Sequence, residues 1–253
     1  MRRLWRNKSI RQLLTGLLAL LVWQVLSLLL GSPLLLPGPA AVLRRLFALM
    51  LTGDFWQRVG FSLLRVGLGF GLGLVLGLVL GLLGGRFPLI QTLLWPYVAA
   101  MQAVPVASFI ILSLLFLSAG QLPVLICFFV VFPPVYENVV QGVQSTSIEL
   151  LEMGRVFGFS WWRRLQYLYL PALKPFLLSA CTVGVGIACK AGVAAEVIAV
   201  AAGSVGESLY EAKLYLLSED LLAWTVAIVI CSRLLQRLLQ GLIQAAFALW
   251  EGR

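Results

Sequence analysis

The sequence predicts an all-α integral membrane protein, and three observations support this fold class. Of its 253 residues, 61% are hydrophobic, whereas soluble domains average about 45–50% apolar residues. Several apolar runs reach the roughly 20 residues that a helix needs to cross the hydrocarbon core of a bilayer. These runs lack the alternating pattern of transmembrane strands. The expected architecture is therefore a bundle of membrane-spanning helices.

Composition also excludes several classes of function. The chain has no histidine, which removes the commonest general base and transition-metal ligand. A GxxxxGK(S/T) phosphate loop is missing, so we expect no ATP site of that kind. The net charge of +9 comes from basic residues that flank apolar runs, so no nucleic-acid partner is expected. Four cysteines lie singly in apolar runs, without metal-ligand spacing, and are interpreted as packing residues: Cys127, Cys181, Cys189 and Cys231.

Six apolar segments are expected to cross the membrane within one domain that covers residues 1–253. Their expected bounds are 13–30, 59–83, 92–117, 122–140, 173–202 and 221–239. The first segment exceeds the roughly 7–15 apolar residues of a signal peptide, so we expect an uncleaved helix. It follows a basic cluster formed by Arg2, Arg3, Arg6, Lys8 and Arg11. Because basic residues favour the cytoplasmic side, both termini are expected in the cytoplasm.

Two polar segments are expected on the outer side of the membrane. Residues 40–51 form an amphipathic pattern, with Arg44 and Arg45 on one side, and we expect a helix that lies along the surface. Residues 203–220 are polar and net negative, and we expect an extracytoplasmic loop there.

Charged residues and prolines locate breaks and ends of the expected spans. Pro133 and Pro134 lie in the middle of the fourth segment and are expected to break its helix. Arg233 and Arg237 interrupt the sixth segment, where we expect the helix to emerge into the cytoplasmic interface. Arg65, near the outer end of the second segment, is likewise expected to extend toward the interface.

A glycine ridge runs along the second segment. Its members recur every fourth residue: Gly69, Gly73, Gly77, Gly81 and Gly85. Such ridges let helix backbones approach closely within a membrane. The ridge therefore predicts a helix packed against other helices, followed by a turn at residues 84–88.

A polar stretch, residues 145–171, separates the fourth and fifth segments. The spacing from Thr146 to Glu149 suits a helix start, Gly158 permits a turn, and Ser160 can begin a second short helix that ends near Pro171. Two short helices at an angle would form a knob that fits a groove of another protein. An interfacial helix pair with tryptophans at the headgroup level explains the same residues equally well.

The stretch resembles the EAA loop of ABC importer permeases. That family pattern is Glu-Ala-Ala, three residues, Gly, nine residues, Ile, one residue, Leu-Pro. This chain matches every interval, with Met-Gly in place of Ala-Ala and leucine in place of isoleucine. The matching residues are Glu152, Met153, Gly154, Gly158, Leu168, Leu170 and Pro171. Residues 36–70, 104–116 and 186–199 are similar to nitrate/sulfonate/taurine-type permeases.

The resemblance implies a type I ABC importer permease of six helices in a prokaryotic plasma membrane. Residues 145–171 would form the coupling helix, with Glu152, Arg155 and Gly158 in a cleft of the ATPase. The implied partners are a second copy of the permease, two cytoplasmic ATP-binding subunits that hold ATP and Mg, and an extracytoplasmic substrate-binding protein. This chain itself would hold no cofactor and catalyse no reaction.

Polar residues within the spans are candidates for the substrate path. Lys190 and Glu196 lie in the fifth segment, where ionisable groups are costly and often functional. Six positions separate them, so they face different sides of a helix. Lys190 is expected either to attract an anionic solute (a sulfonate, nitrate or taurine-like molecule), to extend to the interface, or to pair with a carboxylate such as Glu137. Tyr136 and Asn138 either line the same path or mark the cytoplasmic end of the fourth span.

Two other classes of function remain as alternatives. A secondary transporter or channel not coupled to ATP would need inverted repeats or a chain of intramembrane carboxylates, and neither is evident. A membrane-embedded enzyme is disfavoured by the absence of histidine and of clustered acids.

Overall fold

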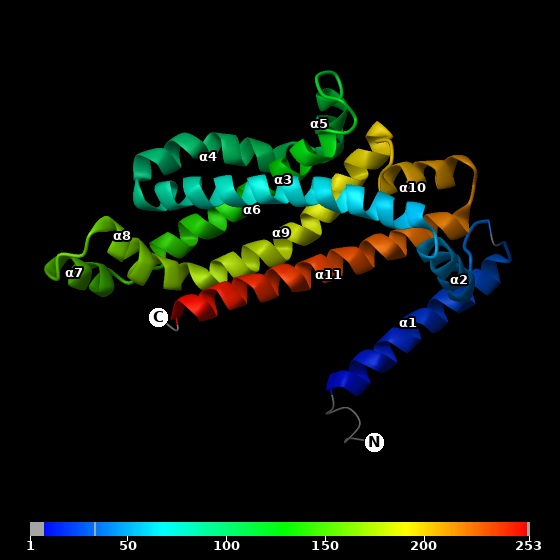
Figure 1. The fold of residues 1–253 in the computed structure, drawn as a ribbon, viewed down its shortest axis with the longest axis horizontal. Helices are drawn as coiled ribbons and strands as arrows, with labels where there is room; N and C mark the ends of the chain where they lie inside the picture. Colours follow the sequence, from blue (N-terminus) through cyan, green and yellow to red (C-terminus); the bar gives the residue numbers. More distant parts are fainter. Residues whose placement is uncertain (1–7, 33, 252–253) are drawn as a thin grey trace.

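The computed structural model describes residues 8–32 and 34–251 as a bundle of long helices (Figure 1). Pro33 and the N-terminal residues Arg2, Arg3 and Arg6 lie outside the described residues. The helices are α1 (Lys8–Leu30), α2 (Pro39–Met50), α3 (Gly53–Arg86), α4 (Pro88–Ala103), α5 (Val106–Ser113), α6 (Leu122–Gln144), α7 (Ile148–Val156), α8 (Trp161–Arg164), η2 (Leu165–Tyr169), α9 (Leu170–Ala199), α10 (Val205–Leu214) and α11 (Ser218–Glu251). The described residues contain no strand. This confirms the predicted fold class.

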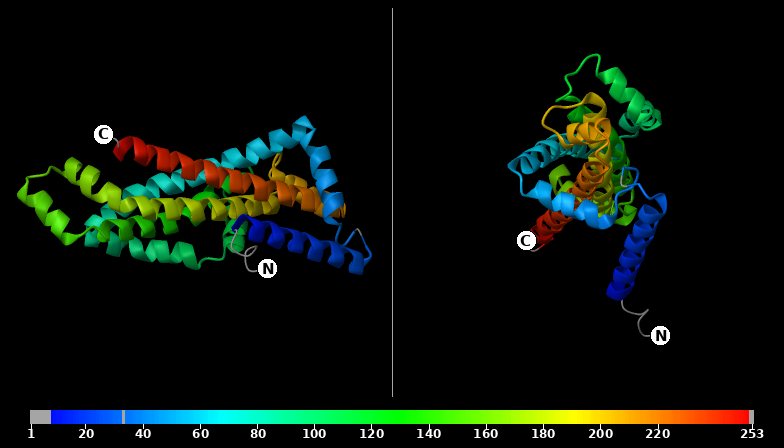
Figure 2. Two further views of the ribbon diagram at one scale, coloured as in Figure 1. Left: turned by 90° about the horizontal axis from the view of Figure 1, so that it is seen from below. Right: turned by 90° about the vertical axis from the view of Figure 1, so that its right-hand side faces the viewer.

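Four helices are long and apolar enough to cross a membrane: α3, α6, the continuous run from α8 to α9, and α11. The pair α4 and α5 qualifies together but bends by 97°. Its break lies at Val104 and Pro105, because a proline disfavours helical conformation in the residue that precedes it. The apolar part of α1, Leu14–Leu30, is shorter. Helix α1 stands away from the bundle, attached near α2 (Figure 2).

The centre of the bundle is α6, which lies between α3 and α9. The predicted glycine ridge of α3 faces a valine ladder on α6, formed by Val131, Val135, Val139 and Val143. A Cβ atom added at Gly77 would lie 2.7 Å from Val135 Cγ1, and one at Gly81 would lie 2.7 Å from Val139 Cβ. The two backbones therefore approach as closely as the ridge predicted.

Two predictions about local breaks in this bundle are wrong. The turn expected at residues 84–88 begins only at Phe87, because Gly84 and Gly85 extend the ridge onto Tyr136 and Val143. Pro133 and Pro134 lie inside α6, which continues from Leu122 to Gln144. Proline removes one hydrogen bond per residue, but close packing on both faces holds α6 in one piece. The α6–α9 core also buries Cys127, Cys181 and Cys189, whereas Cys231 of α11 is partly buried.

One end of the bundle is formed by α2, α10 and the beginning of α11. The amphipathic helix predicted at residues 40–51 is present as α2, and it buries Val42 and Leu46. Arg45 of α2 forms an ion pair with Asp220 of α11, with 2.9 Å between Nη2 and Oδ2. This hydrogen bond raises the pKa of the Arg45 guanidinium. The loop expected at residues 203–220 is wrong in part, because Ser204 caps α10 within it.

Candidate coupling segment and polar pockets

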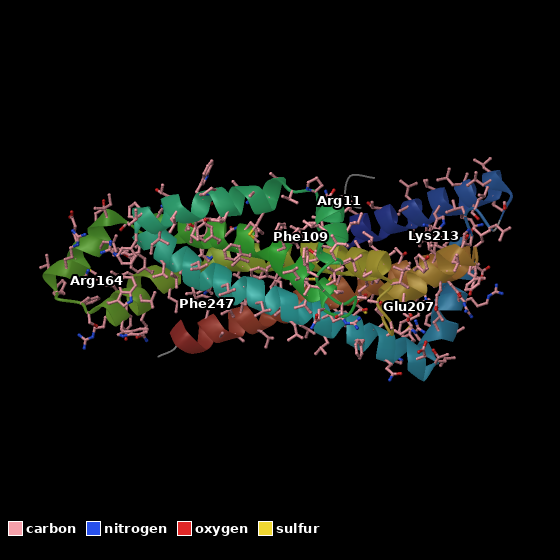
Figure 3. The ribbon with its side chains drawn as sticks, turned by 90° about the horizontal axis from the view of Figure 1, so that it is seen from above. Arg11, Phe109, Arg164, Glu207, Lys213 and Phe247 are labelled. Atoms are coloured by element: carbon pink, nitrogen blue, oxygen red, sulfur yellow. The ribbon has the colours of Figure 1, made fainter. Side chains whose placement is uncertain are left out.

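The stretch predicted to bind a partner forms one end of the elongated molecule, and α10 lies toward the opposite end together with α2 (Figure 3). Figure 3 labels Arg164 at the first end and Glu207 and Lys213 at the second. We call residues 145–171 the coupling segment. Because it projects beyond the long helices, a second protein can contact it without disturbing the core.

Hydrogen bonds at its turns shape the coupling segment. Ser147 caps α7 and accepts a bond from Leu150 N at 3.2 Å. The helix start predicted from Thr146 is therefore displaced by one residue, and Thr146 is buried. Gly158 has a φ of +63°, which strains any residue with a Cβ. Ser160 begins α8 as predicted and accepts from Arg163 N at 3.5 Å.

A tight contact holds α7 against the beginning of the continuous helical run Trp161–Ala199. A Cβ atom on Gly154 would lie 3.0 Å from Cδ1 of the buried Leu168. Phe159 N donates to Gly154 O at 2.9 Å, and Arg164 Nε donates to Phe159 O at 3.0 Å. The glycine that replaces the second alanine of the family pattern thus permits close packing.

The second short helix does not end near Pro171, contrary to prediction. It passes through the π-helix η2 into α9, so Trp161–Ala199 is one continuous helical run. Leu170 N donates to Leu165 O, five residues back. Pro171 has no N–H to donate, so the wider turn that precedes it leaves no donor unpaired. Leu170 is partly buried and Pro171 is exposed.

The outward side of the coupling segment combines apolar and charged groups. Val156, Phe157 and Trp162 are 84%, 70% and 74% exposed. Glu152 and Arg155 are also exposed, and neither has an ion-pair partner among the described residues. Met153 is 41% exposed. Exposed apolar anchors beside unpaired charges are typical of a protein–protein interface.

The structure does not bring the four predicted pathway residues together. Tyr136 is buried and lines a cavity of about 290 Å³ with Glu137, Gln141 and Gln144. Within the described part of the chain, its hydroxyl has no hydrogen-bond partner. Asn138 instead donates to Pro134 O within α6, at 2.7 Å.

Lys190 is exposed beside a different cavity, of about 310 Å³, between α9 and α11. Arg233 of α11 lines this cavity as well. The pairing of Lys190 with Glu137 is wrong, because Glu137 lines the other cavity and no described ion pair joins them. Arg233 lies near the midpoint of α11, which continues to Glu251; the emergence of this helix into the cytoplasmic interface at Arg233 and Arg237 stays a prediction.

Glu196 is fully buried in a polar network that sequence reasoning missed. Ser62 Oγ donates to Glu196 Oε2 at 2.7 Å, and Gly206 N donates to the same oxygen at 3.2 Å. Ser62 Oγ also accepts from Val205 N at 3.0 Å. Arg65 Nη1 lies 3.6 Å from Glu196 Oε1. The network joins α3, α9 and the start of α10.

The interfacial position predicted for Arg65 is therefore wrong. The residue is only 9% exposed, and its guanidinium also lies 4.5 Å from the ring centroid of Phe61. The inward orientation places the guanidinium beside the carboxylate of Glu196, which acts as its counter-ion. A signal for this pair was available, since Arg65 and Glu196 are opposite charges within two long apolar segments.

These features define a polytopic helical membrane protein with an exposed helix–turn–helix segment at one end. The family model described as "Binding-protein-dependent transport system inner membrane component" matches residues 73–248. The chain therefore belongs to this family, whose members are permease components of ABC transporters. Membership confirms the resemblance stated from the coupling segment, and it defines a transport permease rather than an enzyme.

Several curated relatives support the assignment over most of the chain. The taurine transport system permease protein of Escherichia coli (strain K12) is 30% identical over 98% of this chain and 94% of its own length. The riboflavin transport system permease protein of Chloroflexus aurantiacus is 33% identical over 89% of this chain and 87% of its own length. The putative aliphatic sulfonates transport permease protein of Bacillus subtilis is 26% identical, with coverages of 84% and 78%.

Proposed function

We propose that this chain is the membrane subunit of an ATP-driven importer of a small anionic solute. Two copies would form the translocation path, and two cytoplasmic ATPase subunits that bind ATP and Mg would contact their coupling segments. An extracytoplasmic binding protein would deliver the solute. With six spans, both termini would lie in the cytoplasm. The observation that carries this proposal is the exposed coupling segment, whose residues match the EAA spacing.

The geometry supports transmission of force from the coupling segment to the spans. Its second helix is continuous with α9 through the run Trp161–Ala199, and Gly154 packs against Leu168 at the start of that run. Movement of the segment would therefore move α9 as a rigid lever. ATP-dependent closure of the ATPase pair would favour one of two arrangements of the spans, which is alternating access by rigid-body switching.

The coupling residues have separate roles in this scheme. Glu152 and Arg155 would pair with charges in the ATPase cleft, and Met153 would fill its apolar part. Gly158 would set the angle between the two short helices. Leu168, Leu170 and Pro171 would join the segment to the span.

The solute class follows from different observations. Two of the relatives are named for taurine and for aliphatic sulfonates, and Lys190 faces a cavity between two spans. Both support an anion. Tyr136 and Asn138 would line the part of the solute path that α6 contributes. Glu196 would act through the network that fastens the outer end of α9, because its side chain is fully buried.

Co-purification tests the coupling assignment. The tagged chain, isolated in mild detergent from its native host, is expected to retain a soluble ATPase, measured as ATP hydrolysis in the eluate. Glu152→Gln and Gly158→Val are expected to lower the retained ATPase at least tenfold. Glu211→Gln is the control for charge, since Glu211 is exposed on α10 at the opposite end. Gly241→Ala is the control for glycine, because no atom lies within 4 Å of its added Cβ.

Three outcomes of this experiment distinguish an ATP-coupled importer from a transporter or channel that is not coupled to ATP. Loss of ATPase in the two coupling variants alone supports the proposal. Retention in all four variants contradicts the role of Glu152 and Gly158. Absence of any ATPase from the wild-type eluate supports the alternative, a transporter or channel not coupled to ATP.

A further inference from the structure

We infer that Lys190 of α9 and Arg233 of α11 form a two-cation pocket that binds the oxyanion group of the transported solute. This inference rests on the proposed import function and assigns its recognition step to a defined place. Arg233 has no such role in the sequence prediction, which placed it at the membrane interface. We call this cavity of about 310 Å³ the cationic pocket.

Helices α9 and α11 pack against each other and run in opposite directions (Figure 1). Gln236 Nε2 donates to the carbonyl oxygen of Thr182, and Gln240 Nε2 donates to Thr182 Oγ1 at 2.6 Å. Arg233 precedes Gln236 on α11. Because the two helices are antiparallel, Arg233 therefore lies beside the part of α9 that follows Thr182 and leads to Lys190. Both side chains line the same cavity.

The cationic pocket has positive charge and hydrogen-bond donors but no carboxylate. Its polar lining residues are Lys190, Ser232, Arg233 and Gln236, together with Cys189. Arg233 Nη1 donates to Gln236 Oε1 at 3.2 Å, which orients the guanidinium and leaves its other N–H groups available. Guanidinium and ammonium groups are the side chains that bind oxyanions most strongly.

The two cations have no protein counter-ion among the described residues. The four ion pairs found there involve neither Lys190 nor Arg233. The intramembrane carboxylate on the same helix, Glu196, is occupied by Arg65 and Ser62. Unpaired charges in membrane-spanning helices are costly, so a bound anion would stabilise the pocket.

The size of the cationic pocket suits a small solute. Its volume of about 310 Å³ is large enough for a sulfonate or carboxylate headgroup with some water. Gly186 contributes to this space, since no atom lies within 4 Å of a Cβ built there. A phospholipid headgroup has the same oxyanion chemistry, and the test therefore separates the two sources.

A cysteine substituted for Val229 would report the electrostatic potential in the cationic pocket. Val229 lines the cationic pocket and is 56% exposed. In the purified permease–ATPase complex, in phosphatidylcholine nanodiscs, Val229→Cys is labelled with the anionic sulfonatoethyl and the cationic trimethylammonioethyl methanethiosulfonates. The anionic reagent is expected to react faster. Lys190→Gln with Arg233→Gln is expected to lower the anionic-to-cationic rate ratio about tenfold, because two nearby charges are removed.

Matched controls isolate the effect of the pocket. Arg237→Gln removes the same charge one turn further along α11, outside the pocket lining, and is expected to leave the ratio unchanged within about twofold. Lys190→Arg with Arg233→Lys preserves the charge and is expected to preserve the ratio. Ethanesulfonate is expected to slow labelling of Val229→Cys, and the neutral solute ethanol is not.

The outcomes are decisive in both directions. The inference is overturned by an unchanged ratio in the double glutamine variant, by an equal fall in Arg237→Gln, or by no labelling of Val229→Cys with either reagent. It is also overturned if added phosphatidylglycerol slows labelling and ethanesulfonate does not, which would assign the pocket to a lipid headgroup. Failure here with normal ATPase retention leaves the import function standing, whereas loss of ATPase binding in the wild type refutes that function separately.

Discussion

Replacing Gly69 of α3 by alanine would insert a methyl group into the contact between α3 and α6. The added Cβ would lie 2.4 Å from Val124 O and 2.5 Å from Cys127 Cβ. Carbon atoms in contact prefer about 3.5–4.0 Å, so the helices must separate by roughly 1 Å. A backbone oxygen cannot move away by changing rotamer, and the whole helix must shift.

The expected cost follows from two opposing effects. Overpacking a well-packed contact costs about 1–3 kcal/mol, and the backbone clash favours the upper end of that range. The better helix propensity of alanine returns about 1 kcal/mol. Gly69→Ala should therefore destabilise the protein by about 2 kcal/mol. Gly71→Ala, on the same helix, meets no atom within 4 Å and should gain up to about 1 kcal/mol.

Thermal stability in detergent tests this difference. After heating and size-exclusion chromatography, the midpoint for loss of the monodisperse peak should differ between the two variants by about 6–12 °C, at roughly 2–4 °C per kcal/mol. The buried Cys127 thiol should react faster with a thiol-specific label in Gly69→Ala, but not in Gly71→Ala. Equal midpoints for Gly69→Ala and Gly71→Ala would refute the interpretation of the ridge as a packing surface.

The remaining predictions concern the end of the bundle at which α2, α10 and the beginning of α11 pack together. Arg65→Met should destabilise the protein by about 3 kcal/mol, because it leaves Glu196 buried without its cation. In the same heating assay, Arg65→Met combined with Glu196→Gln should recover part of that stability. No recovery would contradict the pairing of Arg65 with Glu196. Gly206→Ala should prevent α10 from docking, since its Cβ would lie 2.2 Å from Glu196 Cβ, and limited proteolysis should then cleave near α10; wild-type resistance would count against this. Arg45→Gln should lower stability by at most about 1 kcal/mol, because the ion pair of Arg45 with Asp220 is partly exposed. A fall in the heating midpoint that corresponds to more than this would show that the ion pair contributes more to stability than an exposed pair does.

Much of the fold was predictable because membrane helices follow local rules. Long apolar runs determine where helices form, and the four-residue glycine spacing determined which face of α3 would pack. Gly158 and Ser160 specified the turn of the coupling segment for a similar reason, since a positive φ and an N-cap depend on neighbouring residues alone. The spacing from Glu152 to Pro171 likewise identified the family before any tertiary contact was known.

Only the tertiary structure decided how distant charges are paired. Arg65 is the single charge of its apolar run, whereas Glu196 shares its run with Lys174 and Lys190. Local sequence cannot state which residue supplies the counter-ion. Long-range packing also explains why α6 continues through Pro133 and Pro134. Contacts with α3 and α9 compensate for the backbone hydrogen bonds that the two prolines remove. Lys190 and Arg233 line the same cavity only because α9 and α11 pack side by side in opposite directions. Local chemistry thus determined the helices and their turns, whereas long-range packing determined which charges within the described residues are paired and which are not.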